Sequence, residues 1–178
     1  EGPEGIKIAL ENGVDTIEHG GKPTDNTASL FKEKGAALVA TLSPALPYSI
    51  MDPSISHVDE IGQINGKALF EHMLECIKIC RANGIPVGLG TDVGCPYTTH
   101  YDMWRELYWY HKFIGVSTNE CIYSATCLNA KLIGIDNEVG TIEKGKSADF
   151  IILTKNPLDD LTVLRNPDCV YFRGSKVI

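Results

Sequence analysis

Short apolar runs alternate with amphipathic segments over the first two-thirds of the chain. Apolar side chains at helical spacing predict helices, and short, nearly continuous apolar runs predict strands that are buried on both faces. The predicted helices are 3–12, 24–34 and 66–82, and the predicted strands are 14–20, 36–41 and 86–92. Strands and helices that alternate in this way predict an α/β fold with a covered parallel sheet.

Capping residues and prolines indicate where several of the predicted elements begin or end. Thr24 and Asp25 are the predicted cap of the second helix, and Asp102 is the predicted cap of a helix that reaches Ile114. Ser117 and Glu120 have the spacing of a capping box, which predicts another helix to about residue 128. Residues 42–65 contain several prolines and are predicted to be irregular.

The chain changes character after residue 135. Residues 140–146 are rich in turn-forming residues, and residues 148–153 read as a strand. Residues 169–178 resemble a hairpin that turns at Gly174. We therefore expect a small β module at this end instead of another strand–helix unit.

Composition and charge exclude several classes of protein. The 178 residues are 43% hydrophobic, which is enough for the core of one ordinary domain. A net charge of −7 and a pI near 5.2 argue against a nucleic-acid or anionic-membrane surface. No apolar run approaches the roughly 20 residues that span a bilayer, and no signal peptide opens the chain. We expect a cytoplasmic protein without a membrane or nucleic-acid partner.

The six cysteines form no CxxC pair, which favours reduced thiols over a disulfide framework. Cys76 and Cys80 share a helix face and would supply half of a zinc site. No partner pair follows them in the sequence. We therefore expect these two thiols to pack in the core.

His19 and Asp92 are the strongest candidates for chemistry, because each stands at the C-terminal end of a predicted strand. The C-terminal ends of parallel strands are where barrel hydrolases carry their metal ligands. The alternatives remain open: His19 as a hydrogen-bonded structural side chain, and Asp92 as a turn or helix-capping residue. Glu18 is expected to face away from His19. His100 lies in the loop beyond Asp92, where a substrate contact and an ordinary surface position are both consistent with the sequence.

Three stretches of the sequence resemble the metal-dependent amidohydrolase superfamily. Within it, the nearest branch is the imidazolonepropionase-like and Xaa-Pro dipeptidase or arginine carboxypeptidase group. Residues 12–20 resemble the sixth barrel strand with its metal-binding His, and residues 88–92 resemble the eighth strand with its proton-accepting Asp. Residues 124–130, 132–134, 140–149 and 156–158 resemble the C-terminal signature of the superfamily.

The resemblance implies a partial TIM (β/α)8 barrel, strands six to eight, over residues 1–135, and part of a small β-sandwich over 136–178. It implies that His19 binds one divalent metal and Asp92 the other, with zinc as the default metal and two metals in the intact enzyme. It also implies that His100 lines a pocket for a small-molecule or dipeptide-like substrate. The superfamily's His-x-His pair, bridging Lys and fifth-strand His have no counterpart here, and we expect them before residue 1.

Three hypotheses follow. The first is a C-terminal portion of a metal-dependent amidohydrolase that cleaves C–N bonds with metal-activated water, in which Asp92 is the catalytic proton acceptor. The second is a non-catalytic fragment, or a subunit that needs an oligomeric partner or N-terminal portion for the missing ligands, because three barrel strands leave exposed edges. The third is an unrelated α/β binding module in which Asp92 is a coincidence.

Overall fold

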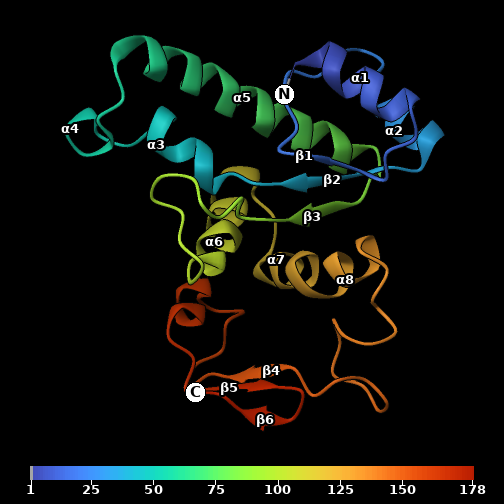
Figure 1. Cartoon of the computed structure of the whole chain (residues 1–178), viewed down its shortest axis with the longest axis vertical. Helices are drawn as coiled ribbons and strands as arrows, with labels where there is room; N and C mark the ends of the chain where they lie inside the picture. Colours follow the sequence, from blue (N-terminus) through green and yellow to red (C-terminus); the bar gives the residue numbers. More distant parts are fainter. Residues whose placement is uncertain (1) are drawn as a thin grey trace. The chain divides into compact units, whose positions relative to one another are not determined.

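The computed structural model describes residues 2–178 (Figure 1). The chain divides into two compact units, Glu1–His100 and Tyr101–Ile178. The helices that follow Tyr101 are therefore grouped with the C-terminal sheet. The boundary predicted after residue 135, between part of a barrel and part of a β-sandwich, stays a prediction.

A three-stranded parallel sheet forms the centre of the first unit. Its strands are β1 (Thr16–Glu18), β2 (Ala37–Ala40) and β3 (Val87–Leu89), in the order β1-β2-β3. The three strands predicted from apolar runs are confirmed, although each is shorter than its run. Because the strands are parallel, their C-terminal ends lie at one edge of the sheet.

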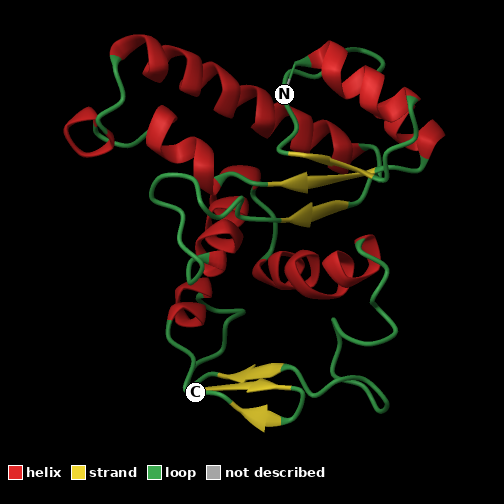
Figure 2. Ribbon diagram, in the orientation of Figure 1, coloured by secondary structure: helices red, strands yellow, loops and turns green. Residues whose placement is uncertain are grey.

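Three helices of the first unit lie on the same face of this sheet: α1 (Pro3–Glu11), α2 (Thr27–Lys34) and α5 (Glu60–Ala82), as Figures 1 and 2 show. The core between helices and sheet is fully enclosed. Its innermost side chains are Leu10, Phe31, Leu38, Cys76, Ile77 and Cys80, each 0% exposed. The predicted packing of the two helical cysteines in the core is confirmed, and all six cysteines are free thiols. No helix among residues 2–178 has the length and apolar character needed to cross a bilayer.

The prediction of an irregular segment over residues 42–65 is wrong. This segment contains η1 (Ser43–Ala45), α3 (Leu46–Ser49) and α4 (Pro53–Ser56), and α5 already begins at Glu60. A proline stands in the first turn of each of the three short helices, where its missing N–H costs no hydrogen bond. The Asp59 carboxylate caps α5 by accepting the Gly62 N–H at 2.7 Å.

The start of α2 also differs from its prediction. Thr24 and Asp25 do not cap this helix, which begins at Thr27. The Thr24 N–H instead donates to Thr27 Oγ1 at 2.7 Å, so the predicted cap belongs to the turn that precedes the helix.

The second unit begins with helices. They are α6 (Met103–Ile114), α7 (Thr118–Tyr123), the π-helical turn η2 (Ser124–Leu128) and α8 (Asn129–Leu132). The capping box at the start of α7 is confirmed, since Ser117 Oγ accepts the Glu120 N–H at 3.2 Å. Leu107, Tyr110, Cys121 and Leu161 form the core of this unit with the short 3-10 helix η3 (Leu161–Arg165).

A small antiparallel sheet completes the second unit. It consists of β4 (Phe150–Ile152), β5 (Cys169–Phe172) and β6 (Ser175–Lys176), in that order. The predicted hairpin is confirmed. Arg173 and Gly174 both have positive φ (49° and 78°), as a two-residue hairpin turn of type I′ requires.

Candidate active site

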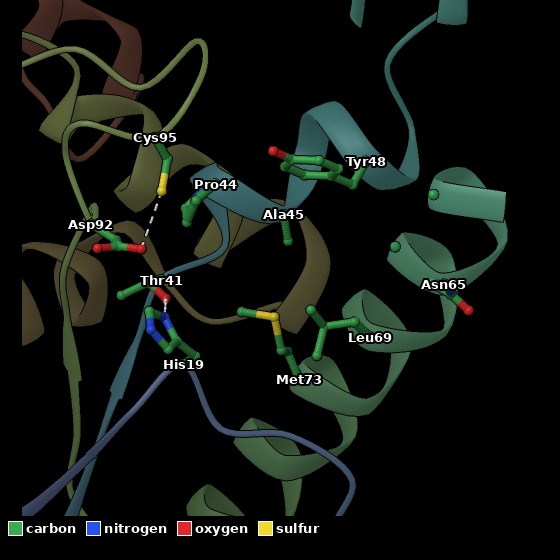
Figure 3. A pocket seen from close by; sticks show the side chains of 12 residues that line it. His19, Thr41, Pro44, Ala45, Tyr48, Asn65, Leu69, Met73, Asp92 and Cys95 are labelled. Carbon is green, nitrogen blue, oxygen red and sulfur yellow. Dashed lines mark hydrogen bonds between the residues drawn. The ribbon is translucent and has the colours of Figure 1, made fainter. Parts of the chain in front are cut away.

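The C-terminal edge of the parallel sheet opens into a pocket of about 410 Å³. His19 follows β1, Thr41 follows β2 and Asp92 lies just beyond β3, and all three line this pocket (Figure 3). The structure therefore brings the two predicted metal ligands to one site. Consecutive parallel strands place them there, as the strand pattern predicts.

His19 is held in a defined orientation. Its backbone N–H donates to Val39 O at 3.0 Å, which extends the pairing of β1 with β2 by one residue. Its Nδ1 lies 2.5 Å from Thr41 Oγ1, so Nε2 is the nitrogen left to ligate a metal. Glu18 faces elsewhere, as predicted, and its carboxylate accepts the Thr16 hydroxyl at 2.7 Å.

Both candidate ligands have a backbone conformation that is uncommon for residues other than glycine. The φ angle is 67° at His19 and 49° at Asp92. Such left-handed residues cost free energy and cluster at functional sites, where the surrounding structure holds them in place. The two strand ends thus turn sharply at the side chains that the sequence singles out.

A cysteine lies beneath the turn that follows His19. The Cys76 thiol accepts a hydrogen bond from the Gly21 N–H, and a Cβ on Gly20 would lie 3.2 Å from Cys76 Sγ. The hydrogen bond between the two thiols lowers the pKa of Cys76, and the same bond together with burial raises the pKa of Cys80 far above its ordinary value. The Cys80 thiol therefore stays protonated, and both side chains pack in the core beneath the site.

Asp92 has one neighbour that the sequence does not predict. Cys95 Sγ donates to Asp92 Oδ2 at 3.3 Å, and both residues line the pocket. Burial and the neighbouring carboxylate raise the pKa of the Cys95 thiol above its ordinary value. Cys95 is therefore a neutral thiol that donates to the carboxylate at neutral pH.

This contact predicts a measurable change in thiol reactivity. Asp92→Asn removes the negative charge and should lower the pKa of Cys95, so alkylation of Cys95 by iodoacetamide near pH 7.5 should become severalfold faster. Alkylation of Cys169, which is half-buried in β5, serves as the internal control and should keep its rate. Mass spectrometry of peptides after timed alkylation measures both rates. An unchanged Cys95 rate would contradict the contact.

The far wall of the pocket comes from α3, η1 and α5. The α5 residues Gly62, Gly66, Leu69 and Met73 recur at intervals of three or four, so they lie on one helix face, and Asn65 lines the pocket beside Gly66. Tyr48 of α3 crosses this face at Gly66, where a Cβ would overlap the Tyr48 carbonyl oxygen. Glycine at this position permits the close approach of α3 to α5.

The structure does not bring every predicted site residue together. His100 is exposed and is not among the described residues that line the pocket, so its contact with substrate stays a prediction. Within residues 2–178, no group of three or more His, Cys, Asp or Glu side chains is arranged to hold a metal ion. Thr41 was missed, although its place after the second strand was a signal that could have identified it.

Comparison with known proteins gives consistent matches over almost the whole chain. A prolidase-type protein from Bifidobacterium longum superimposes with a TM-score of 0.94 and 36% identity, over 98% of this chain and 44% of that protein. A Xaa-Pro dipeptidase structure superimposes with a TM-score of 0.85 and 31% identity, over 98% of this chain and 42% of that protein. The ochratoxinase of Aspergillus niger is 28% identical over 99% of this chain and 36% of its own length. The chain thus spans less than half the length of these relatives.

The family-level comparison agrees with the resemblance seen in the strand ends and the C-terminal signature. The model of the amidohydrolase family matches residues 1–177. This match, and a mixed α/β fold shared with the relatives, confirm the expected superfamily. The chain belongs to the amidohydrolase family.

Proposed function

We propose that this chain is the C-terminal part of a metal-dependent amidohydrolase that hydrolyses C–N bonds in amide or peptide-like substrates. The single observation that carries the proposal is the meeting of His19 and Asp92 in one pocket at the C-terminal edge of the sheet. In this proposal β1, β2 and β3 are strands six to eight of a (β/α)8 barrel, and residues 136–178 belong to a small β-sandwich. Enzymes with that barrel carry their chemistry at this edge.

The chemistry of the two side chains fits a divalent metal centre. An imidazole nitrogen and a carboxylate oxygen are common zinc ligands. The hydrogen bond between His19 Nδ1 and the Thr41 hydroxyl is the kind of outer contact that fixes a metal-binding imidazole. His19 would hold one metal through Nε2, and Asp92 would hold the other. When bound, such metals lower the pKa of water and polarise a carbonyl group.

Asp92 has a second role in the proposal. Its carboxylate takes a proton from the attacking water and returns it to the leaving nitrogen, as a general base and then a general acid. The thiol of Cys95 donates to Oδ2 and leaves Oδ1 available. Cys95 thereby biases which oxygen faces the reacting atoms.

The metal content of the intact protein that carries this chain tests the proposal. We expect about two divalent metals per chain, and His19→Ala should remove about one of them because an imidazole ligand is lost. His57→Ala is the matched control, because His57 is an exposed C-cap of α4 and should leave the metal content unchanged. Elemental analysis of the purified proteins gives the result. Equal metal content in the two variants would contradict the proposed ligand.

The names of the relatives indicate the substrate class. They include an ochratoxinase and a Xaa-Pro dipeptidase whose structure has methionine bound in the active site. We propose a small amide or dipeptide-like molecule as the substrate here.

A second candidate function is a subunit that must associate with a polypeptide carrying the remaining ligands. The first unit leaves β1 and β3 as sheet edges. Large apolar side chains are exposed in the second unit, among them Ile142 at 90% and Phe172 at 56%. Elemental analysis and sedimentation of the purified 178-residue chain decide between the two. Stoichiometric metal and hydrolase activity in a monomer would exclude the subunit hypothesis.

A further inference from the structure

The pocket has two chemically different ends. One end carries His19, Thr41, Asp92 and Cys95, which are the polar groups described above. The other end is walled by Pro44 and Ala45 of the η1 segment and by Leu69 and Met73 of α5. Figure 3 shows Leu69 and Met73 projecting from α5 toward the segment that carries Ala45. We call these four side chains the apolar recess.

The recess is a fixed part of the fold. Met73 is only 2% exposed, and Ala45 is 7% exposed. The close contact between α3 and α5 at Gly66 holds the two walls at a set distance. A recess whose walls are set by backbone packing discriminates ligands by size and shape better than one formed by mobile side chains.

The part of the recess that this chain forms is uncharged. Among the 12 described residues that line the pocket, Asp92 is the acidic one and none is Lys or Arg. An anionic substituent in the recess would lose its hydration without gaining a cationic partner, and burial of an unpaired charge is strongly unfavourable. A neutral apolar substituent would instead gain from burial against Leu69 and Met73.

We infer that the apolar recess binds a neutral, apolar side chain of the substrate, next to the C–N bond that is cleaved at the polar end. Leu69 and Met73 are then residues that determine specificity. This inference rests on the proposed function for its reacting bond. Beyond the proposed function, it specifies the substituent of the substrate that lies on the α5 side of the pocket.

Substrate selectivity in the intact protein tests the inference through a charge placed in the recess. With a matched pair of amides that carry a Leu or an Asp side chain, kcat/KM should favour Leu by about 10²-fold or more, the scale at which pockets discriminate mismatched groups. Leu69→Lys supplies a cation and should reduce that preference at least about tenfold. Ala68→Lys makes the same change at the neighbouring exposed position of α5 and should leave the preference intact. Equal preferences in the two variants would overturn the inference.

Binding to the full chain provides a readout that does not depend on turnover. The sequence has three methionines, Met51, Met73 and Met103, so methyl-labelled protein should give three assignable signals, with Met73→Leu identifying its own. N-acetyl-leucinamide should shift the Met73 signal and leave the other two unchanged, whereas N-acetyl-aspartic acid amide should shift none.

The two measurements separate the inference from the proposed function. A selective Met73 shift without hydrolysis of any C–N substrate would support the recess and count against the proposed function. Hydrolysis without a Met73 response, and with unchanged selectivity in Leu69→Lys, would overturn the inference about the recess and leave the proposed function standing.

Discussion

Asp92→Asn is expected to lower the kcat of the intact protein by about 10²- to 10⁴-fold on the proposed mechanism, which is the range that positioned acid–base groups contribute. The amide keeps the size of the carboxylate and can still lie at the end of β3, but it cannot accept a proton from water. KM should change much less, because the pocket keeps its apolar recess. Steady-state kinetics give both constants, and metal content is measured on the same samples.

A matched substitution separates this effect from a general change in charge. Glu18→Gln makes the same chemical change on the same sheet, at an exposed carboxylate that contacts Thr16 and does not line the pocket. Its kcat should stay at the wild-type value. If Asp92→Asn also retained normal turnover, the mechanism assigned to Asp92 would be refuted.

Gly66→Ala is expected to destabilise the fold by about 1–3 kcal/mol or more, the usual cost of overpacking a closely packed core. The added methyl group would overlap the backbone carbonyl of Tyr48, and a backbone atom cannot move aside as a flexible side chain can. Either α3 separates from α5 or the start of α5 is distorted. The midpoint of denaturant unfolding measures the loss.

Gly5→Ala provides the opposite result at a matched position. Gly5 also lies inside a helix, α1, but an added Cβ there would meet nothing within 4 Å. Because alanine favours the helix over glycine, this variant should be more stable by about 0.5–1 kcal/mol. An increase in the stability of both variants would show that helix propensity, not the contact with Tyr48, governs Gly66.

The sequence predicts those parts of the fold that depend on local periodicity. Apolar runs identify β1, β2 and β3 because a covered parallel sheet buries both faces of its strands. The prolines in residues 42–65 predict irregular chain, yet they occupy the first turns of short helices, where proline is well tolerated. A composition rule does not distinguish these two uses of proline. The position of proline within each turn does.

The site likewise has residues that the sequence predicts and contacts that it does not. His19 and Asp92 could be found because they end strands, and the order of strands places them together. The contact between Cys95 and Asp92 could not be found, because it depends on the path of the loop after β3. The approach of α3 to α5 at Gly66 was equally hidden, since an isolated glycine in a helix gives no indication of what packs against it.

The position of Gly66 on α5 has a consequence for how enzymes of this kind diversify. Leu69 and Met73 lie about one and two turns further along the same helix face, away from the junction with Tyr48. Substitutions at those two positions can change which substituent is accepted while the junction keeps the scaffold rigid. Mutational libraries at residue 69, which is half-buried, should therefore contain many folded variants with altered selectivity. Libraries at the buried residue 73 should tolerate chiefly apolar side chains of similar volume, and libraries at residue 66 should lose most of their members to misfolding.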